Sequence, residues 1–322
     1  MSKLTYFAAV AAVIGLGCGQ ALAAETWEAK LYAADGGLAT GALPGPGWYF
    51  VNLSAVATND PNTTNWGKQT DVKSNIVVEV PELVWVTPWQ VFGAKYAVGI
   101  AQAFDIIDTR VPTPNGSLAL GGAGLFGTVL MPANLSWALG NNFFLDARVA
   151  VVLPTGTYRN PFVVPGGNIT AVNFFTVDTA LSLSWLHDGW NVSARIYYLT
   201  NTPDQIIDYR TGNVFGTEET ISKKIDKWTV GVNGFTQTQV QNDSGSAVAQ
   251  LYGPEAAANG HRMGAYGAGL VLGYNFGPLS ITGWCDHVFY AQNYAGGDLC
   301  YARVVVPLSG ESEAPKVVAA KY

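Results

Sequence analysis

The sequence has 322 residues and a formal net charge of −6 at pH 7, from 17 Lys and Arg against 23 Asp and Glu. Only 12% of the residues are charged, which is about half the share in a typical soluble domain, and the acidic balance argues against nucleic acid as a partner. After the first two dozen residues, no apolar run approaches the ~20 residues of a membrane-spanning helix. With 37 Gly, 10 Trp and 15 Tyr, the composition is typical of a transmembrane β-barrel.

The first residues have the pattern of a secretory signal peptide. Lys3 precedes an apolar run, and the tripeptide Ala-Leu-Ala at 21–23 forms the expected cleavage site. Residues 1–23 are therefore predicted to be removed during export, with cleavage one residue later as a near alternative. A lipoprotein signal around Cys18 is the competing interpretation, but Gly15 stands where such a signal has Leu.

The mature chain is predicted to begin with a segment that precedes the first strand. Residues 24–46 carry Trp27, Leu31 and Tyr32. We expect this segment either to fold into the barrel lumen as a plug from the periplasmic side or to remain a loose periplasmic tail. Residues 47–308 have the pattern of the transmembrane β-barrel, and 309–322 form a C-terminal tail.

Twelve segments alternate apolar and polar residues over the length of a tilted membrane-spanning strand. In Phe143–Leu153, apolar residues occupy every second position, while Asp146 and Arg148 lie between them. Such a row faces the core in a soluble sandwich and lipid in a membrane barrel. The expected strands are Trp48–Thr58, Asn75–Thr87, Val91–Ala103, Thr128–Leu139, Phe143–Leu153, Asn173–Trp185, Trp190–Thr200, Gly216–Lys224, Lys227–Gln239, Met263–Asn275, Leu279–Tyr290 and Asp298–Leu308.

The connections between these segments alternate in length, which distinguishes a barrel from a sandwich. Short turns such as 88–90 and 187–189 alternate with long polar loops, including 104–124, 155–172 and 241–262. Outer-membrane barrels have short periplasmic turns and long extracellular loops. The predicted fold class is therefore all-β: a transmembrane antiparallel up-and-down β-barrel of 12 strands in the bacterial outer membrane.

Many of the tryptophans cluster next to the inferred periplasmic ends of the strands. Indole rings prefer the level of the lipid headgroups, so these residues predict a membrane-interface girdle. Core aromatics of a sandwich are the alternative. The residues are Trp48, Trp85, Trp89, Trp137, Trp185, Trp190 and Trp228.

The same alternation predicts nine charged residues in the lumen. Glu79 and Glu82 fall on one face only if a β-bulge at Pro81 shifts the ladder, and we expect that bulge. In Trp48–Thr58, alternation puts Asn52 and Ser54 on the lumen face and the apolar row toward lipid. The charges can brace the barrel as ion pairs or line a path that selects the solute. The nine are Glu79, Glu82, Lys95, Asp146, Arg148, Asp178, Arg195, Asp286 and Arg303.

Two cysteines remain after the signal peptide. Cys285 and Cys300 can form a disulfide in an oxidising periplasm, and two unpaired cysteines facing lipid are the alternative. His187, His261 and His287 are scattered and, with the cysteines, lack the spacing of metal ligands. We therefore predict no metal site and no cofactor.

Several motifs together resemble a known family. They are GPGWY at Gly45–Tyr49, LPTGTY at Leu153–Tyr158, NTPDQIIDYRTG at Asn201–Gly212, QNDSG at Gln241–Gly245 and LGYNFGP at Leu272–Pro278. Over about residues 45–308 the chain resembles the MetA-pathway of phenol degradation family of outer-membrane proteins. The resemblance implies a barrel linked to the uptake of aromatic or other hydrophobic compounds. The cysteine pair and the tail after residue 308 depart from the family pattern.

The leading functional expectation is passive transport through a narrow or plugged channel. Its partners would be outer-membrane lipid and a small hydrophobic, in particular aromatic, solute; the oligomeric state is left open. A structural or adhesive barrel is the alternative. A lipolytic enzyme is a third hypothesis, because His287 falls on the inferred outer face. No G-x-S-x-G motif or obvious partner serine accompanies it, so we expect a protein that is not an enzyme.

Overall fold

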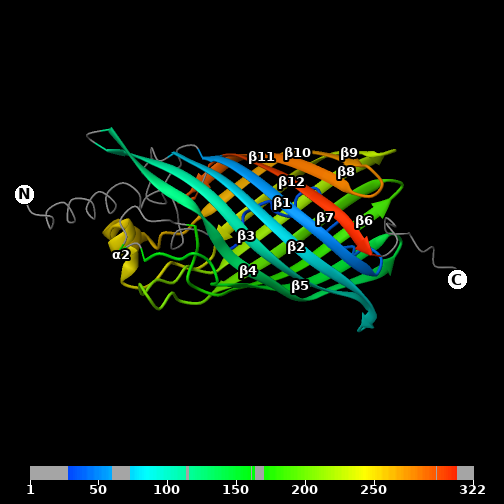
Figure 1. Cartoon of the computed structure of the whole chain (residues 1–322), viewed down its shortest axis with the longest axis horizontal. Helices are drawn as coiled ribbons and strands as arrows, with labels where there is room; N and C mark the ends of the chain where they lie inside the picture. Colours follow the sequence, from blue (N-terminus) through cyan, green and yellow to red (C-terminus); the bar gives the residue numbers. More distant parts are fainter. Residues whose placement is uncertain are drawn as a thin grey trace, which may run out of the picture.

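The computed structural model describes residues 28–59, 73–113, 116–160, 162–163, 170–294 and 296–309. Twelve strands form a closed barrel in which each strand pairs with its sequence neighbours and β1 pairs with β12 (Figure 1). The predicted up-and-down antiparallel β-barrel is confirmed. The signal peptide at 1–23 and the tail after residue 309 lie outside the described residues and stay predictions.

The observed strands agree with the predicted segments in number and order. They are β1 (Gly47–Asn59), β2 (Lys73–Val91), β3 (Ala94–Thr113), β4 (Gly116–Gly140), β5 (Phe143–Leu153), β6 (Thr176–His187), β7 (Trp190–Asn201), β8 (Val214–Ile225), β9 (Trp228–Gln239), β10 (Gly264–Asn275), β11 (Ser280–Gln292) and β12 (Gly297–Ser309).

Short turns join the strands at one end of the barrel, here called the turn end. Asn141 and Asn142 have φ of 51° and 66°, the left-handed backbone that two-residue hairpin turns require. The opposite end, the loop end, carries the short helices α2 (Ala247–Tyr252) and α3 (Pro254–Asn259). Neither of these described helices has the length and apolar character needed to span a membrane.

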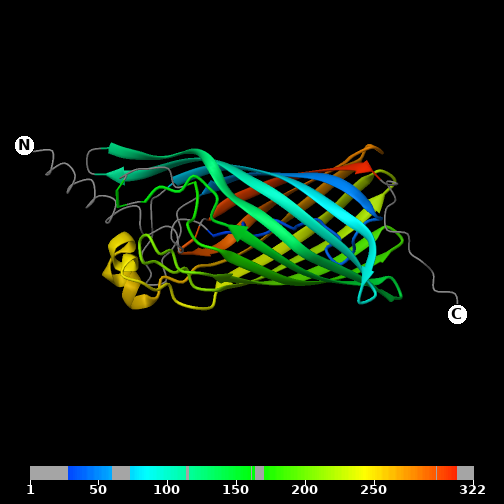
Figure 2. The same cartoon turned by 60° about the horizontal axis from the view of Figure 1, so that its bottom comes forward.

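The predicted loop at 104–124 is instead a long hairpin. β3 continues to Thr113 and β4 begins at Gly116, so the pair extends beyond its neighbours at the loop end (Figure 2). Residues 104–109 keep the period of a strand: Phe104 and Ile106 are exposed, while Asp105 and Ile107 are buried. The β-branched residues of this stretch favour the extended strand.

Strand alternation places apolar side chains on the outer wall of the barrel. In β5, Phe143 and Val149 are exposed outside, while Asp146 and Ala150 are buried inside. In β6 the apolar residues Leu181 and Leu183 are likewise exposed on the outer face. An outer wall of this kind suits a lipid environment.

In β1 and in part of β4, the prediction of which face points to lipid and which to the lumen is wrong. Tyr49, Ala55 and Ala57 are buried inside, while Phe50 and Val56 are exposed outside on the same face as Asn52 and Ser54. Both faces of β1 carry apolar residues, so the period alone could not tell which one faces lipid. In β4, a register shift between Leu130 and Ala133 turns Val129 and Met131 inward.

The predicted lumen position of Glu79 is also wrong. The β1–β2 ladder runs continuously through Pro81, which pairs with Asn52, so no bulge changes the parity. Glu82 therefore faces the lumen and Glu79 faces outward. There the Glu79 carboxylate accepts hydrogen bonds from Asn52 Nδ2 at 2.8 Å and from Ser54 Oγ at 2.7 Å.

Candidate functional site in the barrel lumen

Residues 28–46, here called the N-terminal segment, run along the inside of the barrel. The segment is the dark blue trace enclosed by the strands in Figures 1 and 2. Its residues Tyr32 and Ala33 are 2% and 0% exposed, as deeply buried as any core residue. The segment reaches the turn end at Gly47, where β1 begins.

The first part of the segment packs on β8–β12. The Tyr32 ring stacks on Phe235 of β9 with centroids 4.5 Å apart. Trp284 Nε1 donates to the Ala33 carbonyl at 2.9 Å, and an Arg303 nitrogen donates to the Ala34 carbonyl at 2.7 Å. These bonds satisfy backbone groups that would otherwise be buried without partners.

The second part of the segment is bonded near the turn end. Gly41 N donates to Ser184 Oγ at 2.7 Å, and Ser136 Oγ donates to the Gly41 carbonyl at 2.8 Å. Lys95 Nζ donates to the carbonyls of Leu43 and Pro44, each at 3.1 Å. A Cβ on Gly41 would stand only 2.5 Å from the Phe144 carbonyl oxygen, so glycine permits this close approach.

The side chain of Asp35 is the centre of an ion cluster. Lys30 Nζ lies 3.0 Å, Arg148 3.4 Å and Arg303 3.6 Å from its carboxylate oxygens, and Arg195 makes a still closer contact. Burial by itself would raise the pKa of Asp35, but the four cations hold that pKa well below its usual range. Asp35 is therefore ionised, and the segment places a negative charge among three arginines of the wall.

Two further carboxylates complete the cluster. Asp178 lies 3.1 Å from Arg148 and 3.5 Å from Arg195. Glu218 of β8 lies 3.2 Å from Lys30 and is 3% exposed. Buried charges are tolerated when they are paired in this way.

The structure brings together some of the nine predicted lumen charges and separates others. Arg148, Asp178, Arg195 and Arg303 meet around Asp35, while Glu82 lines the adjoining cavity. Asp146 is buried inside on β5, and Lys95 holds the segment near the turn end. Asp286 lies on a different part of the wall, where it accepts a hydrogen bond from Asn233 Nδ2 at 2.7 Å, and Glu79 faces outward.

The sequence does not predict five of the charged residues inside the barrel. Glu28, Lys30 and Asp35 lie before the first strand, where no periodicity assigns a position. Asp105 lies in the stretch 104–124, which the sequence predicts to be a loop. Glu218 and Glu219 are adjacent in β8, so only one of them can face the lumen. The small and polar residues at every second position, Gly216, Thr220 and Ser222, lie on the same face as Glu218 and could have identified it as the lumen residue.

A cavity of about 200 Å³ lies between the N-terminal segment and the wall formed by β1–β5. Its apolar lining comes from these strands and from β7. The polar lining residues are Glu28, Lys30, Asp35, Glu82, Asp105, Arg148, Thr176, Asp178 and Arg303. The apolar residues of the wall are Leu53, Ile76, Val78, Val80, Ala101, Ala103, Ile107, Phe126, Val129, Met131, Ala150, Val152 and Leu199, and the segment adds Ala29, Leu31 and Ala34.

Two carboxyl groups that border this cavity have oxygens without a hydrogen-bond partner among the described residues. Glu28 is 3% exposed, and neither of its oxygens is bonded. Burial, together with the negative charge of Asp243, raises the pKa of Glu28 well above its usual value. Asp105 is 6% exposed, and its Oδ1 is unbonded. A protonated carboxyl group can donate to a polar atom of a solute.

The seven tryptophans of the predicted girdle lie at the turn end. Trp48 stacks on Trp85 with ring centroids 5.4 Å apart, and Trp85 meets Trp89 edge to face at 5.2 Å. Trp190 lies under Lys223 Nζ at 5.1 Å. Trp137, Trp185 and Trp228 occupy the corresponding ends of β4, β6 and β9.

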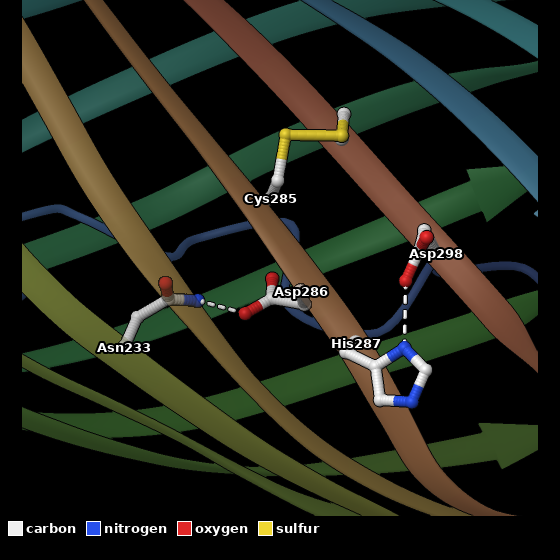
Figure 3. The surroundings of a disulfide bond; sticks show 6 residues. Asn233, Cys285, Asp286, His287 and Asp298 are labelled. Carbon is white, nitrogen blue, oxygen red and sulfur yellow. Dashed lines mark hydrogen bonds and ion pairs between the residues drawn. A yellow bond between two sulfur atoms is a disulfide. The ribbon is translucent and has the colours of Figure 1, made fainter.

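The structure joins Cys285 to Cys300 by a disulfide between β11 and β12, with their Cα atoms 4.0 Å apart (Figure 3). Cys285 and His287 lie on the outer face, whereas Asp286 between them is buried and bonds to Asn233. His287 Nδ1 lies 2.7 Å from Asp298 Oδ1. The observed partner of His287 is thus a carboxylate, which does not provide the serine nucleophile of a lipase.

The family model described as MetA-pathway of phenol degradation matches residues 58–304, which is more than half of the chain. A search of curated proteins gives no match.

Among solved structures, an outer membrane channel from Pseudomonas putida F1 has a TM-score of 0.65 at 14% identity, covering 83% of this chain and 97% of its own. The beta domain of the Bordetella autotransporter BrkA has a TM-score of 0.44 at 11% identity, covering 82% of this chain and 100% of its own. At 14% identity, the similarity to the Pseudomonas putida channel shows the barrel fold.

Proposed function

This chain belongs to the MetA-pathway of phenol degradation family, and from that premise we propose that it is a passive outer-membrane channel for small hydrophobic, in particular aromatic, compounds. The observation that carries the proposal is the apolar cavity between the N-terminal segment and β1–β5. A polar interior with charges alone would favour hydrated solutes, whereas this wall offers contact to a ring.

The size of the cavity supports an aromatic solute. An apolar cavity of about 150 Å³ in another protein stays dry and binds benzene, so the ~200 Å³ found here leaves room for one substituted ring. Binding sites for small molecules are mostly apolar with a few polar groups that orient the ligand. Here Val78, Val80 and Met131 supply apolar contact, and Glu28 and Asp105 supply polar groups at the margin.

We also propose that the N-terminal segment plugs the lumen and that export by the signal peptide places the barrel in the outer membrane. The segment is bonded to strands on several sides of the barrel, including β4, β6, β11 and β12. A segment held at so many points narrows the axial path. The cavity beside it is then a binding site for the solute and not part of an open pore.

The plug is tested by conductance in a planar lipid bilayer. The mature protein is compared with a variant that lacks residues 24–43. We expect the mature protein to be nearly silent and the shortened protein to conduct steadily. Steady conductance from the intact protein would contradict the plug and indicate an open aqueous pore. Silence of both proteins would favour the structural or adhesive alternative.

The solute class is tested by phenol flux into liposomes that contain the purified protein. Val78 and Val77 are adjacent, but Val78 lines the cavity and Val77 is exposed on the outer wall. Val78→Phe should fill the cavity and lower phenol flux several-fold, while Val77→Phe should leave it unchanged. Equal flux through both variants would show that phenol does not use this cavity.

A further inference from the structure

We propose that the lumen site accepts the carboxylate of a monoanionic aromatic acid, and that Asp35 of the N-terminal segment occupies this position as an internal substitute for it. The proposal rests on the proposed function and names the substrate class and the control of the same site. According to this proposal, the segment competes with the solute for the same site and is not a permanent plug.

The geometry around Asp35 is that of an anion-binding site. Guanidinium groups from three separate strands converge on one carboxylate: Arg148 from β5, Arg195 from β7 and Arg303 from β12. Guanidinium groups bind carboxylates with charge-assisted hydrogen bonds and fixed geometry. The segment supplies Asp35 and Lys30, whereas all three guanidinium groups come from the barrel wall. The wall therefore supplies a site whose anion is replaceable.

The carboxylates nearby determine how much negative charge the site accepts. Asp178 already shares Arg148 and Arg195, whereas among the described ion pairs Arg303 meets only Asp35. Removing Asp35 therefore takes from the buried Arg303 the one carboxylate that it pairs with among the described residues, which favours the entry of one anion. A second negative group on the solute would meet Asp178 or Glu82, which line the same cavity. The site thus fits one carboxylate and disfavours two.

The apolar wall lies beside this anion site. Asp35, Arg148 and Arg303 line the same cavity as Val80 and Met131. An aromatic acid can place its ring on the β2–β4 wall and its carboxylate among the arginines at the same time. A neutral phenol satisfies only the first of these two contacts, which is why the acid should bind more tightly.

Competition for the same arginines couples solute binding to the position of the segment. An acid that occupies the site weakens the hold of the wall on Asp35, and docking of Asp35 weakens binding of the acid by the same factor. The aromatic acid would therefore promote release of the plug. Phenol, which does not contact the arginines, would cross at a rate set by the cavity alone.

The test measures benzoate, benzyl alcohol and phenol flux into liposomes for the mature protein and its Asp35→Asn variant. Benzyl alcohol matches benzoate in size but is uncharged. In Asp35→Asn the benzoate flux should rise about tenfold, because a tenfold change corresponds to the free energy of about one charge-assisted hydrogen bond. The flux of the two neutral solutes should not rise. Adding Arg303→Gln to Asp35→Asn should abolish the gain. Asp188→Asn removes a carboxylate that is 83% exposed in a turn and serves as the matched control.

The outcomes separate the two proposals. If all three solutes rise together in Asp35→Asn, Asp35 only braces the segment and the anion site is refuted, while the channel stands. If no solute crosses even without residues 24–43, the proposed channel function itself fails. Should Asp35→Asn not fold, calorimetric titration of the mature protein decides: benzoate must bind more tightly than benzyl alcohol or the dianion phthalate, and equal affinities would overturn the proposal.

Discussion

The two sides of the barrel interior differ in what they offer to the N-terminal segment. The side formed by β6–β12 presents hydroxyl, indole and guanidinium groups, and most of the segment's bonds are made there. The side formed by β1–β5 presents mainly aliphatic side chains and leaves a cavity beside the segment. The polar side fixes the position of the segment, and the apolar side leaves space for a solute.

This division has a simple physical origin. The segment is a strand-free chain whose backbone groups need hydrogen-bond partners inside a closed barrel. Trp284, Thr220 and Ser184 provide them on the polar side. Aliphatic residues such as Ile76 and Val78 offer no donors or acceptors, so they cannot satisfy the backbone groups of the segment.

The largest expected effect on stability comes from removing the charge of Arg195 on the polar side of the lumen. This residue is 3% exposed and contacts both Asp35 and Asp178. Arg195→Met should lower the free energy of unfolding by about 3–5 kcal/mol, because two buried carboxylates lose a counter-ion. The measurement is denaturant unfolding in detergent micelles. Lys223→Met removes an ion pair on the exposed rim and should cost about 1 kcal/mol or less. Similar losses in both variants would contradict the central role of the cluster.

The disulfide on the outer wall should contribute to stability without affecting transport. Cys285 and Cys300 are 15 residues apart, and closing a loop of that length is worth at most about 3 kcal/mol. The double substitution Cys285→Ser with Cys300→Ser should therefore lower stability by that amount or less. Phenol flux should stay unchanged because both residues lie outside the lumen. A change in flux would show that the β11–β12 wall and the lumen site are coupled.

A smaller and more local effect is expected where the segment touches β6. In Gly41→Val, the new side chain would clash with the Phe144 carbonyl oxygen and the backbone of Ser184. Overpacking of this kind costs about 1–3 kcal/mol and should displace the segment, so single-channel conductance should rise. Gly45→Val is the matched control, because a Cβ at Gly45 meets no atom within 4 Å. Equal conductance of the two variants would mean that Gly41 does not hold the plug in place.

The sequence predicted the barrel well because the lipid-facing wall imposes a regular pattern. In Phe143–Leu153 and in β6 the apolar face meets lipid and the polar face meets the lumen, so alternation identifies both faces. The seven tryptophans were placed at the turn end by the same argument about the membrane interface. These features depend on the surrounding lipid, which acts on every strand in the same way.

The lumen site was predicted only in part because the interior is not uniformly polar. Beside β1 the lumen is apolar, and the alternation of Tyr49, Val51 and Leu53 was assigned to the wrong face. The bulge in β4 reversed the assignment of Met131 for a second reason, a register shift that contains Pro132, a residue type found inside strands mainly at bulges. Asp35 lies in a segment without strand periodicity, so only the structure could place its carboxylate among the arginines.

The smallest effect is expected at Glu79, whose outward position distinguishes the two faces of β2. Glu79 pairs across the ladder with Ser54, which is six residues along β1 from Trp48 of the girdle. With a rise of about 3.3 Å per residue and a strand tilt of ~40°, the Glu79 carboxylate lies about 15 Å from the level of Trp48 along the membrane normal. Glu79→Gln keeps an acceptor for Asn52 and Ser54 while removing a charge from lipid, and should raise stability by about 1 kcal/mol or less. Ser54→Ala should lower stability by a similar amount in the parent protein, and by less in the Glu79→Gln background. The ion selectivity of the barrel lacking residues 24–43 should not change in Glu79→Gln. A shift in selectivity would place this carboxylate in the lumen and would restore the predicted bulge at Pro81.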